Sequence, residues 1–152
     1  MNSKLLFTFL TVLVFASAPL CRAAAEDTVL LNTLGYTTGQ SVLLTHMAVG
    51  TLADAFVAKT YKSGQATEFV TTYINITTGM KGQMRKLLDA DTLSKEDAQF
   101  IKNTIDVLDL VMDESRALKA FVSSGDDADA TAYDKARKKA LGEIKTLLGM
   151  KD

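Results

Sequence analysis

The sequence contains one cysteine, one proline and one histidine, and it contains no tryptophan. The proline is Pro19, so the chain after it has no residue that removes a backbone hydrogen-bond donor from a helix interior. The cysteine is Cys21, so the chain beyond it has no thiol for a disulfide, a thiolate metal site or a cysteine nucleophile. The stability of that part of the chain must therefore come from its apolar core.

The single histidine, His46, excludes several metal and haem motifs. A ferritin-like di-iron site needs two Glu-x-x-His units, and a zinc protease helix needs His-Glu-x-x-His; neither pattern occurs. The Cys-x-x-Cys-His, Gly-x-Ser-x-Gly and phosphate-binding glycine-loop patterns are also missing from the sequence. These absences predict that the protein is not an enzyme.

The N-terminal residues have the three parts of a secretory signal peptide. Lys4 gives a positive start, residues 5–15 form an apolar run, and Ala23 to Ala25 offer small residues for cleavage. The sequence thus predicts a signal peptide at 1–25, cleaved at Ala23 or Ala25, and a single domain at 26–152. The mature protein would be periplasmic or secreted, with no membrane span after cleavage.

Two alternatives for this leader are weaker. The apolar run is shorter than the roughly 18 residues of a spanning helix, which disfavours an uncleaved membrane anchor. A lipoprotein signal at Cys21 is disfavoured because Leu20 stands where a small residue is needed.

The predicted mature chain carries a small negative charge. Removing Lys4 and Arg22 from the 17 basic residues leaves 15, against 18 acidic residues, a difference of −3. Nucleic-acid binding needs a concentrated positive surface. The one basic tract, Lys135 to Lys139, is typical of a solvated helix face. We therefore expect no nucleic-acid partner.

Residues 93–122 lie in the longest segment without glycine or proline and are the expected centre of the fold. Ser94 and Asp97 resemble a capping box at its start. A helix of about 28 residues is roughly 42 Å long, so only helices of similar length can cover it. Its apolar residues recur at steps of three and four: Phe100, Ile101, Ile105, Leu108, Met112, Ala117, Leu118, Phe121 and Val122.

Three further helices are expected to cover that apolar stripe. They span residues 38–61, 65–89 and 131–148. Thr38 is the expected N-cap of the first, and Gly149 the residue that ends the last. Short links between the helices favour an all-α fold, an antiparallel up-down-up-down four-helix bundle.

Three segments in the first half of the predicted domain have less regular patterns. Residues 29–34 are expected to form only a short turn that Gly35 ends. Gly50, within the first helix, indicates a close helix crossing. Residues 69–78 are rich in β-branched residues, so a three-helix bundle with a β-hairpin there is the alternative fold.

One histidine and several methionines form the candidate metal site. An antiparallel bundle would bring His46, Met47, Met80 and Met84 toward one end, together with Met150. Imidazole and thioether ligands suit Cu(I), and one His with one Met can hold haem iron. Methionine is also a common core filler. We expect core packing without a cofactor, with metal or haem binding as the alternative.

The remaining cluster is a set of carboxylates. Asp106, Asp109 and Asp113 lie on one side of a helix, where we expect a solvated stripe; binding of Ca²⁺, or pairing with Arg and Lys from a neighbour, are the alternatives. The sequence as a whole predicts an exported, non-enzymatic bundle that binds a protein partner or a small ligand. Wide apolar stripes, as at Leu43 and Met47, also suggest self-association.

Overall fold

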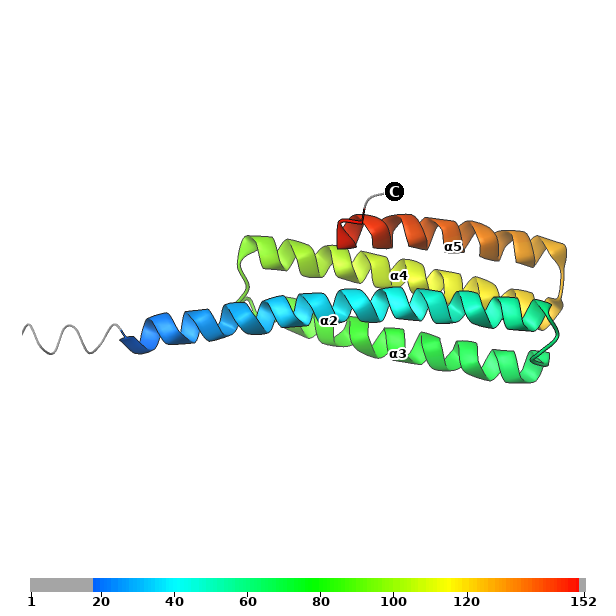
Figure 1. Cartoon of the computed structure of the whole chain (residues 1–152), viewed down its shortest axis with the longest axis horizontal. Helices are drawn as coiled ribbons and strands as arrows, with labels where there is room; N and C mark the ends of the chain where they lie inside the picture. The colour runs from blue at the N-terminus through cyan, green and yellow to red at the C-terminus, as the bar shows by residue number, and fades with distance from the viewer. Residues whose placement is uncertain (1–17, 151–152) are drawn as a thin grey trace, which may run out of the picture. The chain divides into compact units, whose positions relative to one another are not determined.

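The computed structural model describes residues 18–150, and it describes side chains for residues 29–150. Most of the predicted signal peptide, residues 1–17, lies outside the described residues. The described chain forms α2 (Ala18–Val57), α3 (Ser63–Asp89), α4 (Lys95–Ser124) and α5 (Asp127–Leu148), joined by short links (Figure 1). Residues 18–150 contain no strand, so this part of the chain is an all-α four-helix bundle, as predicted.

The described residues fall into two units, divided between Thr37 and Thr38. Residues 18–37 are helical throughout, and Val29, Leu30 and Tyr36 are exposed. Residues 38–150 comprise the remainder of α2 with α3, α4 and α5, and they contain the core.

The boundaries of α2 differ from the prediction. The helix begins at Ala18, so Thr38 is not its N-cap and Gly35 does not end a separate turn. A glycine in a helix interior costs only about 1 kcal/mol relative to alanine, which is too little to stop a helix whose only proline, Pro19, lies in its first turn. At the other end, α2 stops at Val57 instead of Tyr61, because Lys59 takes a left-handed φ of 59°.

Residues 69–78 are helical in α3, so the β-hairpin alternative is wrong. Threonine fits this helix because its hydroxyl can donate to the carbonyl four residues earlier. Four threonines do so, at 2.7 to 3.0 Å: Thr71, Thr72, Thr77 and Thr78. These hydroxyl groups are therefore satisfied within α3.

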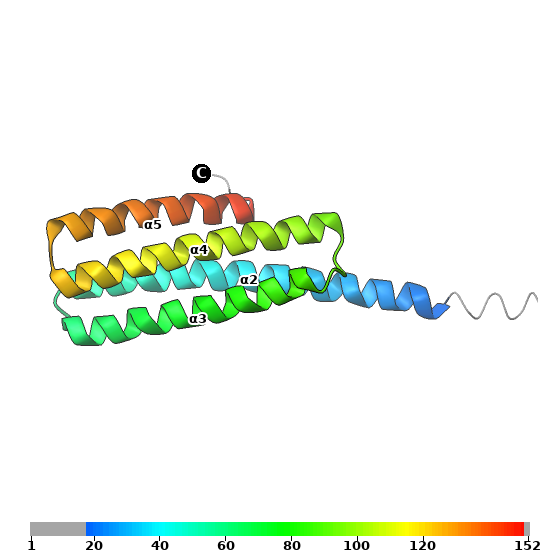
Figure 2. The same ribbon diagram turned by 180° about the vertical axis from the view of Figure 1, so that it is seen from behind.

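The central role predicted for residues 93–122 is confirmed in α4. Ser94 is the N-cap and accepts a 3.1 Å hydrogen bond from the Asp97 amide, while Gly125 closes the helix with a φ of 72°. α4 packs against both α3 and α5, and it lies between them in both views (Figures 1 and 2). Its buried side chains are Ile101, Thr104, Ile105, Val107, Leu108, Val111, Met112, Glu114, Ser115, Leu118 and Val122.

α5 begins at Asp127, four residues before the predicted start at Thr131. Asp127 and Asp129 therefore lie in the first turn, where their charge stabilises the positive end of the helix dipole. The predicted end is confirmed, since Gly149 caps α5 with a φ of 63°.

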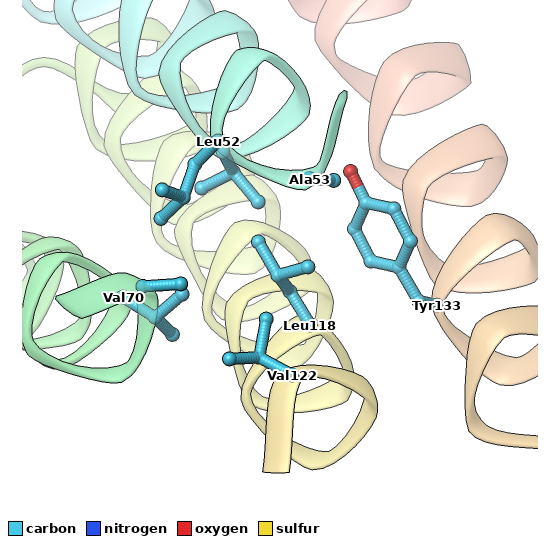
Figure 3. Close-up of a cluster of buried hydrophobic side chains, with 8 residues drawn as sticks. Leu52, Ala53, Val70, Leu118, Val122 and Tyr133 are labelled. Carbon is cyan, nitrogen blue, oxygen red and sulfur yellow. The ribbon is translucent and has the colours of Figure 1, made fainter. Parts of the chain in front are cut away.

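All four helices contribute to one apolar cluster, part of which is shown in Figure 3. Its buried members are Val49, Leu52, Ala53, Ala66, Val70, Leu118, Val122 and Tyr133. Phe56 and Phe121 meet edge to face beside it, with ring centroids 5.4 Å apart. The hydroxyl of Ser63 donates to the carbonyl of Val122 at 2.8 Å, which joins the start of α3 to the end of α4.

Candidate functional site

A hydrogen-bonded pair of ionisable side chains lies in the core between α2 and α4. His46 Nδ1 is 2.8 Å from Glu114 Oε2, and the two residues are 5% and 0% exposed. The helices bury them because each residue falls on an apolar stripe at helical spacing. On α2 the stripe runs Val42, His46, Val49 and Ala53, and on α4 it runs Val111, Glu114 and Leu118.

Two residues of α5 extend this polar region. Arg137 is half-buried, and its guanidinium lies against Gly50 of α2, where an added Cβ would be 3.2 Å from Nη2. Tyr133 lies one turn earlier and extends toward α2, with its hydroxyl on the side of Ala53 (Figure 3). We call His46, Glu114, Tyr133 and Arg137 the core polar cluster. Gly50 thus makes room for the side chain of Arg137. The sequence predicts a close helix crossing at Gly50, but the neighbour that uses the space is a side chain.

Burial dominates the electrostatics of the core polar cluster. It raises the pKa of Glu114, while the hydrogen bond and charge of His46 and the charge of Arg137 act in the opposite direction. Burial also raises the pKa of Tyr133, with a further increase from the Glu114 carboxylate. Glu114 Oε1 and the Tyr133 hydroxyl have no hydrogen-bond partner among the described residues.

The core polar cluster has a structural consequence. Its members come from α2, α4 and α5, and a buried charge is tolerated only where a partner compensates it. The hydrogen bond between His46 and Glu114 joins α2 to α4, and the guanidinium of Arg137 brings α5 against Gly50 of α2.

The predicted metal ligands have different environments. His46 and Met84 are buried, Met80 is half-buried, and Met47 is 56% exposed. Nδ1 of His46 is already engaged by Glu114, and no hydrogen bond between described residues joins a methionine to His46. The metal-site prediction thus rests on the sequence alone.

The three aspartates of α4 do not form a cation site. No group of three or more His, Cys, Asp or Glu side chains in the part of the chain that the structure describes could hold a metal ion. Asp109 pairs with Lys81 of α3, and Asp113 pairs with Arg116 at 3.0 Å. The Ca²⁺ alternative is therefore wrong. Pairing with a basic residue of a neighbouring helix is confirmed for Asp109, whereas Asp113 pairs within α4.

A surface groove of about 510 Å³ runs between α4 and α5. We call it the α4–α5 groove. Apolar side chains line it from both helices: Phe100, Val107, Leu110 and Leu147. Its polar lining residues are Asn103, Asp106, Asp109, Lys139, Glu143 and Thr146. A smaller groove of about 250 Å³, between α2 and α3, is lined mainly by apolar and aromatic residues that include Tyr61, Phe69 and Tyr73.

The charged groups of the α4–α5 groove differ in their pairing. Asp109 is neutralised by Lys81. Asp106, Lys139 and Glu143 are exposed, and none of them has a side-chain partner within residues 29–150. These three charges are therefore available to a ligand.

Sequence reasoning did not find Glu114, Arg137 or the groove. Glu114 lies in the polar run Asp113 to Arg116, and Arg137 lies in the basic tract that was expected to be solvated. The available signal was spacing, because Glu114 follows Val111 by three residues and precedes Leu118 by four, as a core residue would.

Two further findings bear on function. No helix in the described part of the chain is long and apolar enough to cross a membrane. Comparisons with protein-family models, with curated proteins and with solved structures found no match to this chain.

Proposed function

We propose that this chain is an exported, non-enzymatic helical bundle that acts by binding a small molecule in the α4–α5 groove. The observation that carries this proposal is the groove itself. Its volume of about 510 Å³ falls within the range of roughly 300 to 1,000 Å³ that is usual for small-molecule sites. Its lining also has the usual composition, apolar side chains with a few polar groups that can orient a ligand.

The length of the groove suits a small molecule. Its lining residues run from Phe100 to Leu110 on α4 and from Lys139 to Leu147 on α5. Ten residues of helix span roughly 15 Å at 1.5 Å per residue. A compact organic molecule of about this length fits the groove.

The antiparallel up-down-up-down order of the helices is part of the proposal. Its support is the position of the links, which alternate between the two ends of the bundle in Figures 1 and 2. α4 and α5 are then joined by only Gly125 and Asp126, which keeps the two walls of the groove adjacent. The groove is thus formed by neighbouring helices of one bundle.

Export and the absence of catalysis complete the proposal. The leader at 1–25 supports export, and the missing catalytic motifs support a binding role. Mass spectrometry of the protein from its native compartment tests export, since the N-terminus should follow Ala23 or Ala25. A protein that keeps Met1 would contradict this part of the proposal.

An NMR titration tests the groove. The probe is 1-octanol, added to ¹⁵N-labelled mature protein, and the amide shifts should concentrate at residues 100–110 and 139–147. Leu110→Trp should abolish these shifts by filling the groove. Ile76→Trp is the matched control, because Ile76 is exposed on α3, away from the groove lining. Shifts spread over the whole surface, or equal binding by both variants, would exclude the groove as the site.

A further inference from the structure

Building on the proposed function, we infer that the ligand carries a positively charged amine beside its apolar part, and that Asp106 and Glu143 bind the amine. The two carboxylates come from opposite walls of the α4–α5 groove, Asp106 from α4 and Glu143 from α5. Both are exposed and lack a side-chain partner in the described part of the chain. A cation in the groove is attracted by both, and an anion is repelled by both.

The charge balance of the lining supports a cation. Asp109 is paired with Lys81 and contributes little net charge. The unpaired groups are then Asp106 and Glu143, each −1, and Lys139, +1, which leaves a net charge of −1. The free groove therefore attracts a positive ligand.

Lys139 does not cancel Glu143. The two residues are four apart on α5, but no ion pair joins them among the described residues. Lys139 also precedes Glu143, and this order gives a weaker i,i+4 ion pair than a glutamate placed before a lysine. Glu143 consequently remains available, and Lys139 opposes an ammonium ion. Replacing Lys139 with Gln should strengthen amine binding.

Apolar side chains of the α4–α5 groove would bind the alkyl part of the ligand. Val107 and Leu110 line the same wall as Asp106, and Leu147 follows Glu143 by one turn of α5. An alkyl chain of about eight carbons covers much of a groove of roughly 15 Å, the length of ten helical residues. The expected chemical class is an aliphatic amine with an apolar chain of this size.

The test uses three probes that share an eight-carbon chain and differ in charge: octylammonium, 1-octanol and octanoate. Each is titrated into ¹⁵N-labelled mature protein at low salt and neutral pH. Because an exposed charge pair changes affinity by up to about fivefold, two carboxylates should make octylammonium bind roughly tenfold or more tightly than octanoate. Octanol should fall between them. Added salt should reduce the difference, since the carboxylates are exposed.

Variants assign the effect to the two carboxylates. The double variant Asp106→Asn/Glu143→Gln should reduce octylammonium binding to the level of octanol. The matched control is Asp113→Asn/Asp134→Asn, which removes one exposed carboxylate from each of the same helices, outside the groove lining. The control should bind octylammonium like the unmodified protein.

The outcomes separate this inference from the proposed function. Equal binding of all three probes in the groove, or tighter binding of octanoate, overturns the amine inference and leaves the groove as a small-molecule site. An equal loss of affinity in the double variant and its control also overturns the inference. If none of the three probes shifts residues of the groove, the proposed function itself fails.

Discussion

The core polar cluster and the α4–α5 groove contain the same kinds of side chain in opposite environments. Each has a glutamate and a basic residue on α4 or α5, but Glu114 is 0% exposed and paired with His46, whereas Glu143 is exposed and unpaired. A buried carboxylate without compensation is strongly unfavourable, while an exposed one is solvated by water. The polar groups of the core therefore fix how the helices pack, and those of the groove are free to contact a ligand.

The largest expected loss of unfolding free energy follows from removing the buried carboxyl group of Glu114. Glu114→Ala leaves His46 without its hydrogen-bond partner in the core, and leaving a buried polar group unsatisfied costs about 1–3 kcal/mol. Urea unfolding followed by circular dichroism measures the change in unfolding free energy. Glu143→Ala is the control and should stay within about 0.5 kcal/mol of the unmodified protein. Similar losses in both variants would show that the two regions do not differ in this way.

The second prediction concerns the pH dependence of that stability. Burial raises the folded-state pKa of Glu114 above its ordinary value of 4.5. A raised pKa means that the folded protein holds this proton more tightly than the unfolded chain. The contribution of this raised pKa to the unfolding free energy is therefore fully present below pH 4.5. It is lost as the pH rises through the folded-state pKa of Glu114.

Glu114→Gln removes this titration and keeps a hydrogen-bonding group beside His46. The unfolding free energy of the unmodified protein, minus that of the variant, should decrease from pH 4.5 toward neutrality. Glu143→Gln should show no such trend. A difference that is constant over this range, or one that increases with pH, would show that burial does not control the Glu114 carboxyl group.

The third prediction compares two helix glycines. Gly79 has open space around it, so Gly79→Ala should stabilise α3 by about 0.5–1 kcal/mol through helix propensity. Gly50→Ala should gain less, because the new methyl group would lie 3.2 Å from Arg137 Nη2 and the guanidinium would have to move. Thermal unfolding of both variants measures the difference. A gain at Gly50 as large as that at Gly79 would show that Arg137 does not depend on this space.

Much of the fold could be predicted because it depends on local patterns. The stripe of residues 93–122, the N-cap Ser94 and the terminal residue Gly149 each act within one helix, and the structure confirms all three. The predicted start of α2 is wrong because it depends on Gly35 and Thr38 as boundary residues, whereas the helix runs through both. Their local preferences are too weak to end a helix.

The core polar cluster depends on contacts that no single helix shows. His46 and Glu114 are 68 residues apart, and each interrupts an apolar stripe on its own helix. An ionisable residue within the apolar stripe of each of two packed helices indicates a buried pair. This pattern is the sequence signal that predicts the His46–Glu114 contact. The groove offers no such signal, because its volume depends on how far apart the packed side chains hold α4 and α5.

The smallest predicted effect concerns the ion pair between Lys81 and Asp109, which is intermediate between the two regions. The side chain of Lys81 is 12% exposed and that of Asp109 is 43% exposed, so water screens the pair only in part. Asp109→Asn should cost about 0.5 kcal/mol in unfolding free energy at low salt and less at high salt. It should also release the charge of Lys81 beside the α4–α5 groove and weaken octylammonium binding, while Asp113→Asn leaves that affinity unchanged. If Asp109→Asn instead lowers the unfolding free energy as much as Glu114→Ala does, then partial exposure does not weaken the Lys81–Asp109 pair. Burial would then not distinguish the charges that stabilise the fold from those available to a ligand.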